Sequence, residues 1–282
     1  MENSFEIDIL AAKARMNVLD EMRTAHAGHI GGSMSMMEVL AVLYGRVMNV
    51  DINNPKWEKR DRLVVSKGHC GPAVYAMLAE KGFFPKDWLP TLNQPGTRLP
   101  SHCDKNKVLG VDMTTGSLGQ GMSTSLGLAW GLQYQNIDAY TYLILGDGEC
   151  DEGQVWEGAL FASTKRLNKF IGFIDKNDKQ LDGYTKDICD VGDLATKFKE
   201  FGWYSLDVNG HDVNEIYEAI KKAKKQTKPT MIVLHTIKGK DCTFAENLLY
   251  NHHLTFNEEQ YMEAYKFLED KVISLGREKA NV

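Results

Sequence analysis

An acidic, glycine-rich turn near the middle of the chain carries the residues best suited to bind a metal ion. Asp147 stands between two glycines after the apolar run 140–145, and Asn177 comes soon after the apolar run 170–174. With a helical pattern between them, these runs predict a βαβ unit whose strand ends meet where α/β sheets bind ligands. Carboxylate and amide oxygens suit Mg²⁺, and Gly148 allows close approach of a phosphate. We therefore predict a Mg²⁺–diphosphate site; the alternative is an acidic turn without a ligand.

This segment resembles the signature of thiamine-diphosphate enzymes, in which Gly-Asp-Gly is followed by an Asn beyond the next strand. The resemblance implies that Asp147 and Asn177 bind Mg²⁺, or another divalent cation such as Ca²⁺ or Mn²⁺, together with the main-chain carbonyl of Lys179. It places Gly148 and Asn177 at the cofactor as well. Asp178 stands where the family usually has glycine, which affects the turn but leaves the carbonyl available.

Four histidines lie in stretches predicted to be loops. His29 follows Gly28 in the glycine-rich stretch 26–33, and His69 follows the short apolar run 63–65. His102 ends a proline-rich stretch, and His252 lies late in the chain. From the residues alone, a lone loop histidine such as His102 is more often a surface residue than part of a site.

The text around these histidines resembles transketolases. The resemblance implies that His29 is an active-site histidine near the reacting carbons and that His69 contacts the diphosphate. It implies that His102 is a third active-site histidine and that His252 serves both diphosphate and substrate, with His253 as the fallback assignment.

Two further segments extend the resemblance. The glycine-rich stretch 114–121 is similar to a transketolase motif in which Gly116 and Leu118 lie against the aminopyrimidine ring of the cofactor. Glu152 matches a family glutamate that couples two cofactor sites across a dimer interface, so we expect it on the cofactor side of the chain.

The hydrophobic pattern predicts at least five strands alternating with helices. A capping box of Ser35 and Glu38 predicts a helix that begins there and runs to about Met48. The expected fold is one doubly wound α/β domain with a mainly parallel sheet and helices on both faces, which the resemblance identifies as the thiamine-diphosphate-binding fold. The other expected helices are 5–23, 121–135, 213–225 and 258–278, and the other expected strands are 204–208 and 230–236.

Composition excludes several other classes. The chain of 282 residues is 43% hydrophobic and has a net charge of −5, so it lacks the basic surface of a nucleic-acid-binding domain. Its five scattered cysteines have no metal-binding spacing, which favours reduced thiols and a cytoplasmic location. No apolar run reaches the roughly 18 residues of a membrane span, and the N-terminus does not resemble a signal peptide.

The resemblance covers residues 1–282 as a single pyrophosphate-binding domain, which is the first half of a transketolase. The pyrimidine-binding and C-terminal domains are absent, and with them the glutamate that activates the cofactor. We therefore expect an N-terminal subunit of a split transketolase of the pentose phosphate pathway. It would pair with a separately encoded C-terminal subunit in a heterotetramer and move a two-carbon ketol unit from a ketose phosphate to an aldose phosphate.

Three alternatives stay open. A 1-deoxyxylulose-5-phosphate synthase-like enzyme shares the signature, and a noncatalytic subunit could hold the cofactor for a partner. The donor and acceptor could also be unusual sugars.

Overall fold

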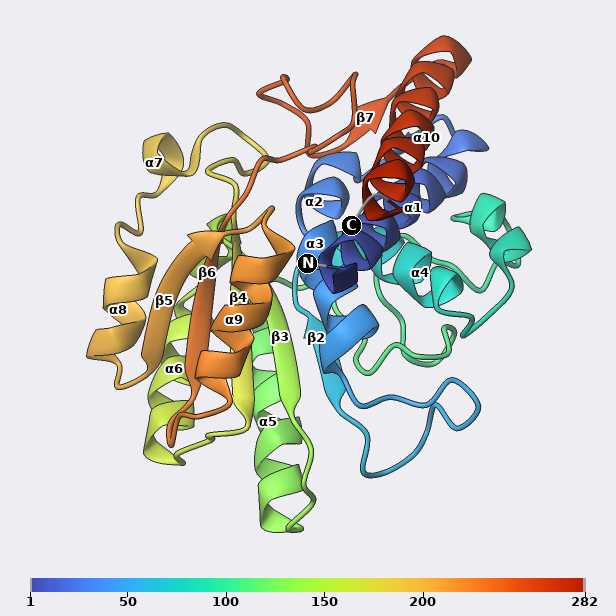
Figure 1. Ribbon diagram of the computed structural model, residues 1–282. Helices are drawn as coiled ribbons and strands as arrows, with labels where there is room; N and C mark the ends of the chain where they lie inside the picture. Colours follow the sequence, from blue (N-terminus) through green and yellow to red (C-terminus); the bar gives the residue numbers. More distant parts are fainter. Residues whose placement is uncertain (1, 281–282) are drawn as a thin grey trace.

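A five-stranded parallel sheet forms the centre of the molecule, and the computed structural model describes residues 2–280 (Figure 1). The strand order is β2–β3–β4–β6–β5, and every neighbouring pair is parallel. The strands are β2 (Arg62–Val65), β3 (Thr141–Gly146), β4 (Phe170–Lys176), β5 (Tyr204–Asn209) and β6 (Thr230–His235). The central strands are apolar along most of their length because helices cover both faces. The predicted doubly wound α/β fold is confirmed.

Alternate residues of each strand feed two separate cores. Tyr142 and Ile144 of β3 point into one core, whereas Leu143 and Leu145 point into the other. The first core is covered by α1 (Glu2–Arg23), α3 (Met37–Val42), α4 (Gly71–Glu80) and α9 (Val213–Ala223). The second is covered by α5 (Gln120–Tyr134), α6 (Gly153–Thr164) and α8 (Leu194–Glu200).

The predicted capping box at Ser35 is wrong. Helix α2 (Ile30–Ser35) already begins in the stretch expected to be a loop, and Ser35 is its last residue. The Ser35 hydroxyl donates to Asp175 Oδ2 at 2.6 Å instead of capping a helix, and Glu38 pairs with Arg15. Packing requires glycine in this helix because neighbouring groups leave no room for a side chain. A Cβ on Gly31 would lie 2.2 Å from the Asn251 carbonyl oxygen.

A two-stranded antiparallel ladder joins the two ends of the chain. It pairs β1 (Ala27–Gly28) with β7 (Leu254–Thr255), and the long helix α10 (Glu258–Ala280) then lies along α1 (Figure 1). The remaining helical segments are η1 (Leu43–Val47), η2 (Gly68–Cys70), η3 (Lys86–Thr91), η4 (Gly148–Asp151) and α7 (Thr185–Ile188). Within residues 2–280, no helix combines the length and the apolar character needed to cross a membrane.

A buried guanidinium ties three of these elements together. Arg15 of α1 is only 1% exposed, and it lies 2.7 Å from Glu38 of α3 and 3.2 Å from Asp241, in the loop after β6. The same guanidinium donates to the Met34 carbonyl oxygen at 2.9 Å. Glu38 and Asp241 are also buried, and Arg15 is the cation that they share, although Lys271 also lies 2.7 Å from Asp241.

We predict that Arg15→Ala lowers the free energy of unfolding by about 3–5 kcal/mol, because it leaves two buried carboxylates without their shared cation. Urea unfolding followed by circular dichroism measures this change. The matched control is Lys266→Ala, which removes an exposed lysine and its ion pairs with Glu269 and Asp270 on α10. The control should leave the unfolding midpoint unchanged; equal midpoints for both variants would contradict the prediction.

Candidate active site at the carboxyl edge of the sheet

One cavity of about 390 Å³ gathers all the site residues that the sequence predicts. It lies at the carboxyl edge of the parallel strands, where α/β sheets bind ligands. The predicted residues in its wall are His29, His69, His102, Gly116, Leu118, Asp147, Gly148, Glu152, Asn177, Lys179 and His252. These residues come from segments spread over most of the chain, so their convergence in a single cavity is a consequence of the fold.

The parallel strands explain why the expected metal ligands meet. Asp147 directly follows β3, and Asn177 directly follows the neighbouring strand β4. The last residue pair between these two strands is Gly146 with Asp175, so the two strand ends lie side by side. Asp147 Oδ1 accepts a hydrogen bond from the Gly148 amide at 3.0 Å, and its Oδ2 accepts from the Asp178 amide at 2.6 Å. The carboxylate is thus held rigidly against the turn that contains Asn177 and Lys179.

The residues present fit a divalent cation. Asp147 is only 4% exposed, and burial together with the nearby charge of Asp175 raises the pKa of its carboxyl to about 7. A cation beside Asp147 would remove this penalty for ionisation. In the described part of the chain no three His, Cys, Asp or Glu side chains form a metal site. The candidate ligands are the Asp147 carboxylate, the Asn177 amide oxygen and the Lys179 main-chain carbonyl, which are hard oxygen donors.

Asp178 keeps the turn that a glycine would form. Its φ is +60°, in the left-handed region that glycine adopts freely and that aspartate tolerates better than most residues. Its side chain is exposed and pairs with Lys176. Aspartate in place of the family's glycine at position 178 therefore leaves the turn that contains Asn177 and Lys179 intact.

His29 lies at the centre of a cluster of imidazole rings. Its ring centroid lies 5.6 Å from that of His69 and 5.5 Å from those of His102 and His252. His252 also lies 4.5 Å from His69 and is part of the cavity wall, whereas the next residue, His253, is exposed beside it. Of the two histidines, His252 therefore lines the same cavity as Asp147, whereas His253 does not.

Burial keeps this cluster uncharged at neutral pH. It lowers the pKa of His69 to about 2, of His252 to about 3 and of His29 to about 4, and it also lowers the pKa of His102. Neighbouring imidazoles lower the pKa of all three further, and Lys67 and Lys238 do so for His69 and His252. A neutral imidazole offers one N–H donor and one acceptor nitrogen. The cluster can therefore bind hydroxyl and phosphate oxygens and exchange protons with them.

Two lysines in the cavity wall received no role in the sequence analysis. Lys67 is buried, donates to the Gly32 carbonyl oxygen at 3.0 Å and pairs with Asp175. Lys238 donates to the Lys179 carbonyl oxygen at 2.9 Å and approaches His252 Nδ1 at 3.4 Å, and burial lowers its pKa to about 8. The sequence could have pointed to both lysines, because each one follows the carboxyl end of a predicted strand within three residues.

Glu149 is a third residue that sequence reasoning missed. Its Oε1 accepts hydrogen bonds from the Gly119 amide at 2.9 Å and from the Ser66 hydroxyl, and its Oε2 accepts from the Gly146 amide at 3.0 Å. Burial raises the pKa of this carboxyl. Glu149 therefore fixes one glycine-rich turn against the other and so holds Gly116 and Leu118 near Asp147.

The cavity is open on the side of Gly116 and Leu118. Gly116 has a φ of +153°, and a Cβ there would lie 3.0 Å from His102 Cδ2, so glycine permits the close approach of that ring. Leu118 is 37% exposed and Leu181 is 60% exposed, although both line the cavity. Glu152 is also exposed, at the N-terminus of α6. Two apolar side chains are therefore exposed at the mouth of the cavity.

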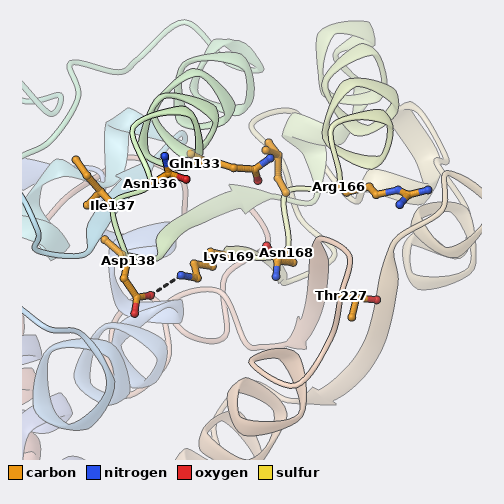
Figure 2. Close-up of a pocket in the computed structure, with 11 residues that line it drawn as sticks. Gln133, Asn136, Ile137, Asp138, Arg166, Asn168, Lys169 and Thr227 are labelled. Carbon is orange, nitrogen blue, oxygen red and sulfur yellow. Dashed lines mark hydrogen bonds and ion pairs between the residues drawn. The ribbon is translucent and has the colours of Figure 1, made fainter.

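A second cavity of about 490 Å³ lies at the opposite, amino edge of the sheet (Figure 2). Its wall includes Gln133, Asn136, Arg166 and Asn168, and an ion pair joins Asp138 to Lys169 beside it. None of the predicted site residues lies there. This cavity therefore shares no wall residue with the candidate site at the carboxyl edge.

Comparison with known sequences identifies the family. The sequence profile described as "Transketolase, thiamine diphosphate binding domain" matches residues 8–268. The chain belongs to the transketolase family. Its site residues therefore occupy the thiamine-diphosphate-binding domain of that family.

Several transketolase subunits are similar over their full length. The chain is 48% identical over 269 residues to the 6-deoxy-6-sulfo-D-fructose transketolase subunit SqwG of Clostridium sp. (strain MSTE9), covering 95% of this chain and 98% of that protein. It is 33% identical over 273 residues to an apulose-4-phosphate transketolase subunit of Phocaeicola vulgatus, covering 96% of this chain and 97% of that protein. The family assignment made from the sequence is confirmed.

Solved transketolases share the fold but are longer. Transketolase from Leishmania mexicana superimposes with a TM-score of 0.85 at 27% identity, covering 98% of this chain and 46% of that enzyme. Human transketolase is 34% identical over 248 residues, which is 84% of this chain and 38% of the human protein. The chain thus spans less than half the length of these transketolases.

We predict that acid destabilises the chain through His69. Folding lowers the pKa of this histidine from about 6.5. The neutral imidazole therefore contributes fully to the free energy of unfolding above pH 6.5, and this contribution is lost as the pH falls below that value. The free energy of unfolding should fall by about 1.4 kcal/mol per pH unit, or by about 2 kcal/mol between pH 6.5 and 5. Urea unfolding at pH 7 and pH 5 should show a smaller loss for His69→Gln than for the parent; equal losses would contradict this.

Proposed function

We propose that the chain is the N-terminal, pyrophosphate-binding subunit of a two-chain transketolase. It would bind Mg²⁺ and thiamine diphosphate and take part in transfer of a two-carbon ketol unit from a ketose to an aldose phosphate. The observation that supports this most directly is the convergence of all the predicted site residues in one cavity. A relative of matching length that is named a transketolase subunit supports the two-chain assembly.

Each part of the cofactor has a matching set of residues. Asp147, Asn177 and the Lys179 carbonyl would hold the metal ion. His69, His252 and Lys238 would donate hydrogen bonds to diphosphate oxygens, while Gly148 would let the main chain approach them. The exposed side of the cavity, formed by Gly116, Leu118 and Glu152, would face the aminopyrimidine ring. When bound, thiamine diphosphate supplies the nucleophilic carbon and the electron sink for carbon–carbon bond cleavage.

The histidines would act on the sugar. His29, His102 and His252 meet within one cluster, and burial keeps them neutral at pH 7. Each can donate a hydrogen bond to a hydroxyl or carbonyl oxygen and accept a proton from a hydroxyl group. This chain would therefore orient the ketose and move protons at its oxygen atoms.

A separately encoded C-terminal subunit would complete the site. It would carry the pyrimidine-binding domain, cover Leu118 and Leu181 at the open mouth, and supply the glutamate that activates the cofactor. Two copies of each chain would form a heterotetramer in the cytoplasm. The Glu152 side chain, exposed at the start of α6, would then lie between two neighbouring sites.

The donor has two candidates that differ in their terminal anion. The ketose phosphates of the pentose phosphate pathway are the first. The second is a ketose sulfonate, because the relative at 48% identity is named for 6-deoxy-6-sulfo-D-fructose. Both offer the same ketol group to the histidine cluster, so the choice depends on contacts to the far end of the sugar.

The first test is to purify the tagged chain with its partner and assay the complex. We expect a partner of comparable size in equal ratio, and turnover of D-fructose 6-phosphate or 6-deoxy-6-sulfo-D-fructose with an aldose phosphate acceptor. Native mass spectrometry and coupled product assays measure these outcomes. Decarboxylation of pyruvate would favour a 1-deoxyxylulose-5-phosphate synthase-like reaction. A complex that binds the cofactor but turns over none of these compounds would favour the noncatalytic alternative.

The proposed metal site predicts a sharp effect at Asp147. Asp147→Asn keeps the size of the side chain but removes its charge, so Mg²⁺-dependent affinity for thiamine diphosphate should fall by roughly 100-fold or more. Isothermal titration with and without Mg²⁺ measures the change.

Asp178→Gly is the matched control for this experiment. Asp178 is the neighbouring acid, its side chain is exposed, and its φ of +60° suits glycine. This variant should bind the cofactor as the parent does. Unchanged affinity in Asp147→Asn would refute the metal-site assignment.

A further inference from the structure

His253 stands opposite His29 because of strand pairing. The antiparallel ladder of β1 and β7 pairs Gly28 with Leu254, so the residues that follow and precede this pair, His29 and His253, face each other. Their ring centroids lie 4.8 Å apart at an interplanar angle of 84°. Side chains opposite each other in an antiparallel pair are direct neighbours. The contact is therefore built into the register of the ladder.

The main chain around His253 is firmly held. Asn251 is fully buried and donates to the carbonyl oxygens of Lys238 at 2.8 Å and Ala245 at 2.9 Å. On the other side, the Phe256 amide donates to the His26 carbonyl oxygen at 3.0 Å. The segment is thus fixed at both ends against the His29 and Lys238 loops, and its one exposed histidine extends from a rigid support.

The His253 ring itself is free to bind another molecule. It is exposed, and within residues 2–280 its ring contact is to His29, with no hydrogen bond to its nitrogens. His29 in turn has a buried Nδ1 that lacks a hydrogen-bond partner among the described residues. The unpaired nitrogen of His29 in the cavity wall and the free ring of His253 just outside it indicate a place for a polyhydroxyl ligand.

The two neighbouring histidines face different ends of the site. His252 lies against His69 and approaches the Lys238 ammonium, which belongs to the expected diphosphate region. His253 lies on the solvent side of His29 and is not part of the cavity wall. A molecule that extends outward from His29 would pass His253 next.

We propose that His253 is a substrate-binding residue that hydrogen-bonds a hydroxyl oxygen of the sugar as it extends from His29 toward the solvent. This inference rests on the proposed transketolase function. His253 would bind the carbohydrate chain beyond the carbons that react, and would leave cofactor binding to His69, His252 and Lys238. It would add a fifth imidazole to the four that line the cavity.

The test compares His253→Phe and His253→Ala in the purified two-chain complex, with D-fructose 6-phosphate and 6-deoxy-6-sulfo-D-fructose as donors. Phenylalanine keeps the ring contact with His29 but removes both nitrogens. We expect both variants to raise the donor KM by about tenfold with little change in kcat, because a binding interaction common to ground and transition states is lost. Affinity for thiamine diphosphate should stay at the parent value.

His26→Asn is the matched control. His26 is also an exposed histidine on the β1 side, its ring contacts Phe256, and its φ of +47° is tolerated by asparagine. This variant should keep the parent KM and kcat. Parent-like kinetics in His253→Phe combined with loss of activity in His253→Ala would show that the ring only supports His29, and would overturn the proposal.

Two other outcomes are separable. If the parent complex binds thiamine diphosphate but turns over no donor sugar, the proposed function fails together with this inference. If the parent turns over sugars and both His253 variants match it, the transketolase proposal stands and only the role of His253 is refuted.

Discussion

The buried carboxylate of Asp175 is the interaction on which the carboxyl edge depends. It pairs with Lys67 and accepts hydrogen bonds from Ser35 Oγ, Thr236 Oγ1 and Asn177 Nδ2. Although burial alone would raise the pKa of Asp175, Lys67 and these hydrogen bonds lower it. One anion at the end of β4 thus joins α2 and the loops after β2 and β6. A buried ion pair with satisfied hydrogen bonds fixes geometry more than it adds stability.

Electrostatics divides the cavity into two regions. At one end, Asp147 is buried beside Asp175 and favours a cation, and Lys238 provides a buried amino group. At the other end, His29 and His102 are kept uncharged by burial. In the proposed function, the first region would hold the metal ion and the diphosphate, and the second would hold the carbohydrate chain.

Much of this arrangement could be predicted from the sequence. Apolar runs located the strands, and parallel strand ends explained why Asp147 and Asn177 meet. Ser35 was misjudged because a serine before a helical pattern usually caps it, whereas here a distant buried acid, Asp175, binds the hydroxyl. Lys67 and Glu149 were missed for a similar reason: Lys67 pairs with Asp175, and Glu149 binds Ser66 and the Gly119 amide, partners that are remote in sequence.

The ladder between β1 and β7 has a consequence for how the chain matures. It pairs residues 27–28 with residues 254–255, which the ribosome makes much later. Contacts between distant segments form late, since a long loop must close before they gain any stability. The ribosome must therefore release the segment that contains β7 before His29 can acquire His252 and His253 as neighbours. Until then, a nascent chain with a complete central sheet would still lack this part of the histidine cluster.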